Sequence, residues 1–285
     1  MSHTLNKLIN LNDAAANNDL ISGDVEIVGA GCGQLDLMTI KAARIVSQAE
    51  AIVYDSLVSS DILSLVSVDC QRHFVGKRCG QPSYKQGDIN ALLAKLALQG
   101  LKVVRLKGGD PHIFGRGAEE SLYLARLGIT SRFTPGITAA LGCASTTGIP
   151  LTYRGTARSV TLVTGTRITN DGLDQAPTHW KGLLEAQSTL VFYMGKEQAT
   201  AISAGLMAVN ADAKLPVAFV TNGGRPNQLI TYANVSNMAE QATLIKDSGP
   251  TLIIIGEVVA VGQELSGLLS DIQAKPTHFV EVAYG

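Results

Sequence analysis

The sequence predicts an α/β fold made of two α/β domains with mainly parallel sheets. Short runs rich in Val and Ile alternate with longer segments in which apolar residues recur at helical spacing. The chain has 285 residues, of which 46% are hydrophobic and 29 are glycine, so it is long enough for two packed cores with many strand–loop junctions. Alternation of strand and helix favours parallel pairing, with helices covering the sheet.

The first half of the chain contains five of these apolar runs. We expect strands at 25–29, 51–55, 72–76, 102–107 and 131–134. Apolar residues at helical spacing between Ile89 and Leu96 predict a helix that ends near Gly100, because glycine commonly follows the last helical turn. By the same argument, 117–127 is a helix that Gly128 closes.

A second series of strands is expected at 159–165, 188–194, 215–221 and 251–259. The segment 134–157, rich in Gly and Thr, interrupts both patterns and marks the boundary between the two series. We therefore expect a domain at 23–135, a domain at 136–265, and a cofactor cleft between them, where ligands often bind. Residues 1–22 are expected to form a flexible N-terminal tail and 266–285 a C-terminal tail.

Composition limits the cellular setting. No apolar run approaches the roughly 18 residues that span a bilayer, and the polar N-terminus lacks the apolar core of a signal peptide, so we expect a cytoplasmic protein. The four cysteines form no C-x-x-C pair and have no histidine at ligand spacing. We therefore expect reduced thiols and no metal site.

Charge is distributed unevenly along a chain whose net charge is −1. Residues 72–167 hold 14 Lys and Arg against four acids, a net of +10, and the remainder of the chain carries −11. This pattern favours a polyanionic small ligand, since several of the cations flank glycine turns rather than helix faces. A nucleic-acid partner is disfavoured, because the chain is slightly acidic overall and only 5% aromatic.

A glycine turn follows the first expected strand, in Val25–Gly33. The G-x-G pair resembles the start of a dinucleotide-binding motif. That motif requires a third glycine, and Gln34, which follows Gly33, stands where that glycine is expected. We therefore disfavour NAD or FAD and keep an oxidoreductase only as an alternative.

The most informative stretch is Val103–Gly117, in which an apolar strand leads into Gly108-Gly109-Asp110-Pro111. Together with Gly76-Lys77-Arg78, Tyr54-Asp55 and Pro135–Ala140, it resembles the uroporphyrinogen-III C-methyltransferase branch of the tetrapyrrole methylases. The resemblance runs from about Gly23 to Val259. It implies the two-domain fold of that family rather than a Rossmann-type methyltransferase.

The resemblance also implies an activity. It is the S-adenosylmethionine-dependent conversion of uroporphyrinogen III to precorrin-2 by two successive methylations, which feeds sirohaem and cobalamin synthesis. A sister methylase that acts on a later corrin precursor is the close alternative. Family members commonly form homodimers, so we expect a homodimer that binds a tetrapyrrole and neither nucleic acid nor membrane.

Site residues follow by resemblance. Asp55 is the candidate proton acceptor and Lys77 the candidate proton donor; from the residues alone, Asp55 is equally a turn residue and Lys77 a surface cation. The candidate cofactor-binding residues are Cys32, Gly108, Gly109, Asp110, Ile113, Thr138, Ala139, Met194 and Gly223. The candidates for binding substrate carboxylates are Arg78, Arg105, Arg116, Arg154 and Arg158.

Several positions depart from the family pattern. Cys32, Gln34 and Leu35 replace proline, an acid and proline in the first glycine turn. Ser56 replaces an arginine after Asp55, and Pro82 replaces a histidine. These changes affect the substrate side of the assignment more than the cofactor side.

Overall fold

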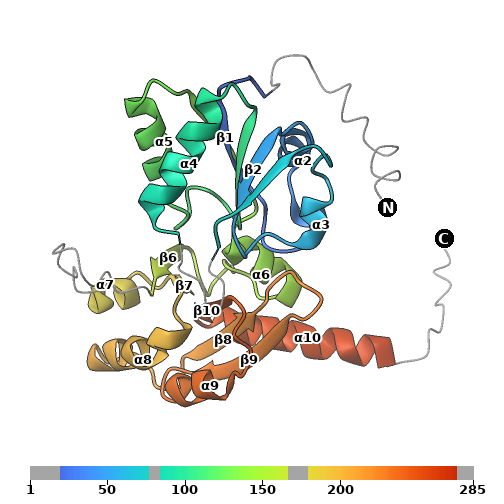
Figure 1. The fold of residues 1–285 in the computed structure, drawn as a ribbon. Helices are drawn as coiled ribbons and strands as arrows, with labels where there is room; N and C mark the ends of the chain where they lie inside the picture. The colour runs from blue at the N-terminus through green and yellow to red at the C-terminus, as the bar shows by residue number, and fades with distance from the viewer. Residues whose placement is uncertain (1–19, 77–83, 166–178, 275–285) are drawn as a thin grey trace. The chain divides into compact units, whose positions relative to one another are not determined.

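The computed structural model describes residues 20–76, 84–165 and 179–274. Its contacts divide the chain into two compact units (Figure 1). The N-terminal unit consists of Met1–Cys143 together with Thr221–Leu229, and the C-terminal unit of Ala144–Val220 together with Ile230–Gly285. Each unit contains one five-stranded sheet.

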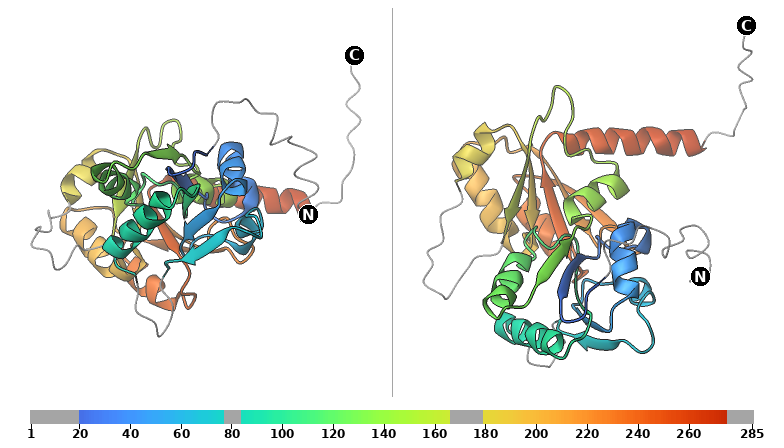
Figure 2. Two further views of the ribbon diagram at one scale, coloured as in Figure 1. Left: turned by 45° about the horizontal axis from the view of Figure 1, so that its top comes forward. Right: turned by 90° about the horizontal axis from the view of Figure 1, so that it is seen from above.

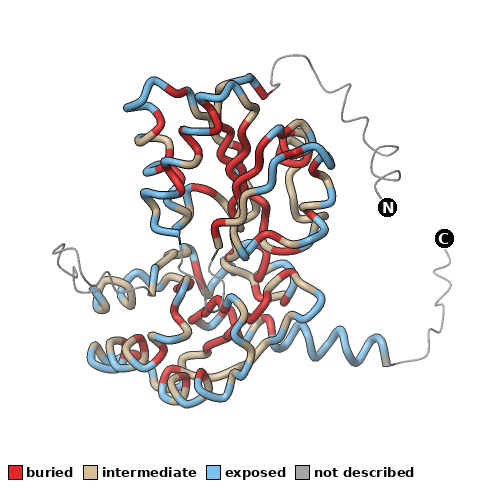
Figure 3. The backbone as a smooth tube through the Cα atoms, viewed as in Figure 1, coloured by how far each residue is buried: buried red, intermediate tan, exposed pale blue. Residues whose placement is uncertain are grey.

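The sheet of the N-terminal unit is entirely parallel, in the order β3-β2-β4-β1-β5. Its strands are β1 (Val25–Gly29), β2 (Ala51–Tyr54), β3 (Gln71–Phe74), β4 (Val103–Lys107) and β5 (Ser131–Thr134). The central strands β1 and β4 are buried along their whole length, as expected for a parallel sheet covered on both faces (Figure 3). Their carboxyl ends all reach the same edge of the sheet.

Helices cover both faces of this sheet (Figures 1 and 2). One face packs against α2 (Ile40–Ser47) and α3 (Ser60–Leu63), which share a core with Val104 and Leu106 of β4. The other face packs against α4 (Gln86–Leu98) and α5 (Gly117–Arg126). The strands are therefore held between two apolar layers, and the polar residues at their ends are left to the loops.

The sheet of the C-terminal unit has the order β6-β7-β10-β8-β9 and is mixed, because β6 and β7 are parallel while β7 and β10 are antiparallel. Its strands are β6 (Val160–Thr164), β7 (Thr189–Tyr193), β8 (Pro216–Thr221), β9 (Leu229–Asn234) and β10 (Thr251–Ile255). The other helices in the described parts of the chain are α6 (Ala139–Thr147), α7 (Trp180–Glu185), α8 (Ala199–Ala208), α9 (Met238–Leu244) and α10 (Val258–Ala274), with short 3-10 turns at Leu35–Leu37 and Lys196–Gln198. One core joins this sheet to α7, α8 and α9.

The α/β class and the mainly parallel pairing are confirmed, and the expected strands lie within a residue or two of the observed ones, with two exceptions. Strand β9 was not predicted, because its residues are only partly buried and lack a marked apolar run. The expected strand at 251–259 was too long: β10 ends at Ile255 and α10 begins at Val258. In the described parts of the chain, no helix is both long and apolar enough to span a bilayer.

The ends and the boundary of the expected domains also differ from the structure. Leu20, placed in a flexible tail, is buried, and its amide donates to Gln48 Oε1. Residues 266–274, expected in the C-terminal tail, continue α10. The division between units falls at Cys143/Ala144 inside α6, not at 135/136, and 221–229 joins the N-terminal unit.

Candidate active site

Four loops follow the carboxyl ends of β1, β2, β4 and β5, at one edge of the parallel sheet. In open α/β sheets this edge is where ligands bind. Most of the residues expected to bind the cofactor, and the candidate base Asp55, lie in these loops.

Glycine backbones join the first of these loops to the others. Gly109 N donates to Gly31 O at 2.7 Å, and Gly31 N donates to Gly109 O at 3.2 Å. A Cβ on Gly29 would lie 2.5 Å from Gly136 N and 2.6 Å from Gly109 O, closer than side-chain atoms approach. Three loops thus meet backbone to backbone, which only glycine permits here.

Asp110 links the loop after β4 to the loop after β5. One carboxylate oxygen accepts from His112 N at 2.8 Å and the other from Gly136 N at 3.0 Å. Both oxygens are thus used within the protein, and they hold the glycine turn and the Pro135–Ala140 segment together. Asp110 therefore fixes the two loops to each other whether or not it touches a ligand.

The Gly108-Gly109 turn faces two neighbouring loops. A Cβ on Gly108 would lie 2.5 Å from Leu57 Cβ, and Gly109 has φ +69°, with Thr138 Cα and Ala139 N 3.8 Å from where its Cβ would stand. Ile113 follows on the same loop, and its amide donates to Asp110 O. The structure therefore brings five residues expected at the cofactor into one neighbourhood: Gly108, Gly109, Ile113, Thr138 and Ala139.

The segment 221–229, which contains Gly223, packs against the turn after β1. A Cβ on Gly33 would meet Gly224 O at 2.6 Å, and Arg225 Nη2 donates to Leu57 O at 2.9 Å. Cys32 lies half-buried at this contact, and burial raises the pKa of its thiol. Cys32 and Gly223 are thus both near the loops of the N-terminal unit.

Met194 belongs to the C-terminal unit, directly after β7. The residue is 51% exposed and its φ is +53°, which is unusual for a residue other than glycine. An exposed methionine on a strained turn is not a core filler, and strained backbone is concentrated at functional sites.

The candidate base Asp55 follows β2 and is held by two donors. Its Oδ1 accepts from Leu57 N at 3.0 Å, and its Oδ2 accepts from Arg105 Nη2 at 3.3 Å, with 24% of the side chain exposed. Asp55 is therefore both a turn residue, bonded to Leu57 N, and the ion-pair partner of Arg105. Its carboxylate remains accessible to a ligand.

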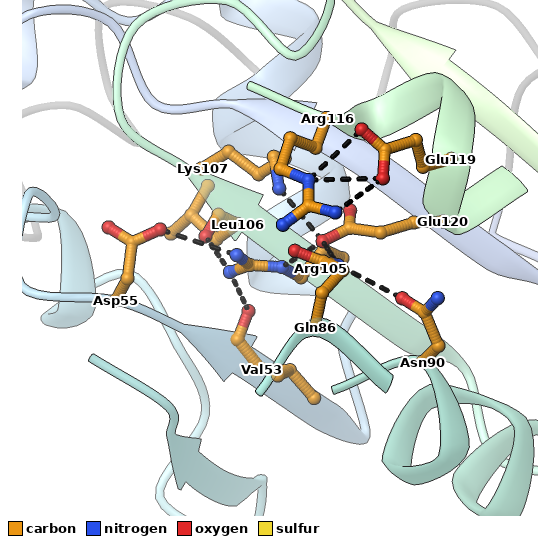
Figure 4. A network of polar contacts seen from close by, with 10 residues as sticks. All are labelled: Val53, Asp55, Gln86, Asn90, Arg105, Leu106, Lys107, Arg116, Glu119 and Glu120. Atoms are coloured by element: carbon orange, nitrogen blue, oxygen red, sulfur yellow. Dashed lines mark hydrogen bonds and ion pairs between the residues drawn. The ribbon is translucent and has the colours of Figure 1, made fainter. Parts of the chain in front are cut away.

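Arg105 was expected to bind substrate, and the structure places it differently. It is 4% exposed, and it donates to Asp55, to Glu120 Oε1 at 3.2 Å and to two backbone carbonyls (Figure 4). Because β4 is covered on both faces, a cation on it must find its partners inside the protein. Arg105 is therefore part of a buried network, not a surface cation open to a carboxylate ligand.

The other expected substrate arginines are at the surface or outside the described residues. Arg116 is exposed and forms an ion pair with Glu119 at 2.6 Å, and hydrogen bonding to that carboxylate raises the pKa of Arg116. Arg154 and Arg158 are exposed in the turn before β6. Lys77 and Arg78 lie outside the described residues.

Sequence reasoning missed two residues at this site. Glu120 is buried completely on the face of α5 that also carries Gly117 and Leu124. An acid at helical spacing from buried residues was a usable signal, because a buried carboxylate needs a cationic partner. Arg225 carried no comparable signal, since its contact with Leu57 joins residues far apart in the sequence.

Comparison with known proteins gives consistent results. The family model described as tetrapyrrole (corrin/porphyrin) methylases matches residues 24–239. Siroheme synthase of Salmonella typhi is 46% identical over 244 residues, which are 86% of this chain and 52% of that protein. The chain thus spans about half the length of the curated relatives it matches.

Solved structures show the same likeness. Uroporphyrin-III C-methyl transferase from Thermus thermophilus, complexed with S-adenyl homocysteine, aligns with a TM-score of 0.71 and 35% identity over 84% of this chain and 99% of that one. A cobalt precorrin-4 methyltransferase aligns with a TM-score of 0.72 over 83% and 95% of the two chains, but at 20% identity it supports the fold alone. With a family model that matches most of its length, the chain belongs to the tetrapyrrole methylase family.

Proposed function

We propose that this protein is an S-adenosylmethionine-dependent C-methyltransferase that converts uroporphyrinogen III to precorrin-2 by two successive methylations. The observation that carries the proposal is its 35% identity to the Thermus thermophilus enzyme over 99% of that chain, whose structure holds S-adenyl homocysteine. Siroheme synthase, 46% identical, supports a product that enters sirohaem synthesis.

The loops at the sheet edge suit this cofactor. S-adenosylmethionine needs apolar walls, exposed backbone groups and few charges, and it supplies an electrophilic methyl group on a sulfonium. Gly108, Gly109, Thr138 and Ala139 are proposed to contact it, and at Gly109 nothing lies nearer than 3.8 Å to where a Cβ would stand. Cys32, Asp110, Ile113, Met194 and Gly223 complete the proposed binding set.

Asp55 is the proposed proton acceptor. When the pyrrole carbon forms its bond to the methyl carbon, the carbon–sulfur bond breaks, its electron pair stays on sulfur, and a proton must leave the carbon skeleton. A positioned base accelerates such a step by about 10²–10⁴-fold. Asp55 is partly exposed and is oriented by Arg105 and Leu57 N, so its carboxylate can accept that proton without reorganising. Lys77 is the proposed proton donor.

The polycarboxylate ring needs cations on the surface of the site. Arg116, Arg154 and Arg158 are exposed and remain proposed ligands for its acid groups, as does Arg78. Arg116 would exchange Glu119 for a substrate carboxylate, a change of small cost because exposed ion pairs contribute little.

The test is methyl transfer from a labelled donor. Protein, uroporphyrinogen III and S-adenosylmethionine labelled at the methyl carbon should give a dimethylated tetrapyrrole. Asp55→Asn should lower kcat about 10²-fold or more, whereas Asp61→Asn, an exposed acid in the first turn of α3, should not.

Absence of label in the ring would reject the proposal. If uroporphyrinogen III stays unlabelled but a later corrin precursor, supplied in its place, takes up the label, the sister methylase is favoured.

The assembly is part of the same proposal. A homodimer is expected by resemblance to the family, and light scattering of the purified chain measures it directly. A monomer at working concentration would remove the dimer from the proposal without affecting the methylase assignment.

A further inference from the structure

Glu120 joins three elements of the N-terminal unit through one oxygen atom. Its Oε1 accepts from Lys107 Nζ at 2.8 Å, from Gln86 Nε2 at 3.0 Å and from Arg105 Nε at 3.2 Å (Figure 4). These donors come from β4 and from the first turn of α4, while Glu120 itself lies on α5. A single carboxylate thereby fixes two helices to the central strand that ends at the site.

Arg105 transmits this constraint to Asp55. Its guanidinium is planar and rigid, so fixing Nε also fixes the direction of the other two nitrogens. Nη1 donates to Val53 O at 3.3 Å and Leu106 O at 2.9 Å, and Nη2 is directed at Asp55 Oδ2. The position of the Asp55 carboxylate therefore depends on how Glu120 holds the opposite end of the guanidinium.

The charges of the network agree with such a role. Arg105 and Lys107 are both buried on β4, and burial together with the neighbouring Arg105 lowers the pKa of Lys107. Glu120 and Asp55 supply the two negative charges that balance them. Without Glu120, Arg105 Nε would lose the carboxylate that holds it, and the guanidinium could turn away from Asp55.

Stability alone does not account for this arrangement. Buried ion networks often contribute less than an apolar core of the same size, because the charges lose their hydration. Glu120 Oε2 also has no hydrogen-bond partner among the described residues, although it is buried. Burying a carboxylate with one unsatisfied oxygen lowers the free energy of unfolding, so stability does not explain why Glu120 is there. A role in positioning its neighbours does.

We infer that Glu120 is a positioning residue for methyl transfer: through Arg105 it holds the Asp55 carboxylate where the proton must be accepted. This inference rests on the proposed function, in which Asp55 is the base. Misplacing a reacting group by about 1 Å can lower a rate about 10²-fold, so a residue that touches no substrate can still control kcat.

The experiment compares Glu120→Gln in two backgrounds. In the wild-type background kcat should fall about 10–10²-fold, while KM for both substrates and the affinity for S-adenosylhomocysteine stay unchanged. In an Asp55→Asn background, followed by single-turnover label transfer, the same change should have little further effect. An equal fall in both backgrounds, or no fall in the wild type, would overturn the inference.

Two further variants distinguish a displaced Asp55 carboxylate from a misfolded protein. Glu120→Gln combined with Lys107→Met removes one charge of each sign, so the charges of the remaining Arg105–Asp55 pair stay balanced. The double variant should melt near the wild-type temperature. Its kcat should still be low, because Glu120 no longer holds Arg105. Glu185→Gln, which breaks the exposed Lys181–Glu185 pair, is the matched control and should leave kcat unchanged. Recovery of full kcat in the double variant would contradict the positional role.

A crystal structure of Glu120→Gln keeps this inference distinct from the proposed function. The Arg105 Nη2–Asp55 Oδ2 contact, 3.3 Å here, should lengthen or be lost. If it is retained, the inference is wrong whatever the activity. If the wild-type protein transfers no methyl group, the proposed function fails, and the Asp55 displacement alone decides whether Glu120 positions that residue.

Discussion

Individual glycines decide how closely the loops of the candidate site approach. At Gly29 the nearest neighbours of a Cβ would be backbone atoms, which cannot move aside as a flexible side chain can. At Gly87, in the first turn of α4, nothing lies within 4 Å. Substitution of the same residue type therefore has opposite consequences at these two positions.

Gly29→Ala should destabilise the protein by about 1–3 kcal/mol, because the added methyl forces three loops apart. Gly87→Ala, as the control, should be neutral or stabilising by up to about 1 kcal/mol, since alanine is the better helix former. Urea unfolding measures both. Equal effects of the two substitutions would contradict the close contact between Gly29, Gly109 and Gly136.

Two thiols of the N-terminal unit, Cys32 and Cys143, give a second prediction at this scale. Burial raises the pKa of Cys143 to about 12 and also raises that of Cys32, so both are protonated at pH 8, and the thiolate that reacts is scarce. Cys143 is 3% exposed, whereas Cys32 is half-buried. Iodoacetamide at pH 8 should therefore label Cys32 slowly and Cys143 more slowly, as read by peptide mass spectrometry.

Raising the pH toward 10 should speed labelling of Cys32, because its thiolate fraction grows. Unfolding in urea should remove the difference between the two sites. Rapid labelling of Cys143 in the folded protein would show that α6 opens in solution.

At the scale of elements, α10 contains two glycines in different surroundings. A Cβ on Gly262 would lie 2.6 Å from Ile149 Cγ1 and 2.9 Å from Ile149 Cα, so this glycine allows close packing. Gly267 has nothing within 4 Å and lies on the exposed side of the helix. The helix therefore needs its first glycine for packing but not its second.

Gly267→Ala should stabilise the protein by about 0.5–1 kcal/mol, because alanine loses less backbone entropy in a helix. Gly262→Ala should destabilise it, because Ile149 must move. Differential scanning calorimetry of the two variants gives the comparison. If Gly262→Ala proved as stable as Gly267→Ala, the packing of α10 on Ile149 would be looser than the structure shows.

Elements with clear apolar patterns were predictable, and the errors occurred where one pattern fits two structures. The run from Thr251 to Val259 is mostly apolar, and such a run does not distinguish a buried strand from the buried start of a helix. Gly256, with φ +143°, interrupts the strand, and α10 begins at Val258. Half-buried β9 gave too little pattern to be recognised.

At the scale of the whole molecule, the two units are not continuous segments of the chain. Residues 221–229 run from the end of β8 to the start of β9 in the second sheet, yet they pack with the N-terminal unit, against Cys32, Gly33 and Leu57. From its position in the sequence, this segment was expected in the second domain, 136–265. The contact brings Gly223 and Arg225 to the loops that carry Asp55 and the glycine turns.

Cofactor binding should be visible as stabilisation of the whole protein. A ligand at about 100 times its Kd raises the free energy of unfolding by about 2.7 kcal/mol, so S-adenosylhomocysteine should raise Tm by several degrees. NADH at the same concentration should not, because the first glycine turn lacks the third glycine of a dinucleotide site. A shift with NADH but none with S-adenosylhomocysteine would restore the oxidoreductase alternative.

The sequence by itself determined the fold class, nearly all of the strands and the family, because apolar periodicity and glycine motifs are local properties. Only the tertiary structure decided what each charged residue does. Arg105 and Arg116 both flank the same glycine turn, but Arg105 lies on a strand covered on both faces, whereas Arg116 is exposed at the N-terminus of α5. Burial depends on which residues pack from elsewhere in the chain. Arg105 is buried and joins Glu120 of α5 to Asp55, whereas Arg116 stays at the surface and pairs with Glu119.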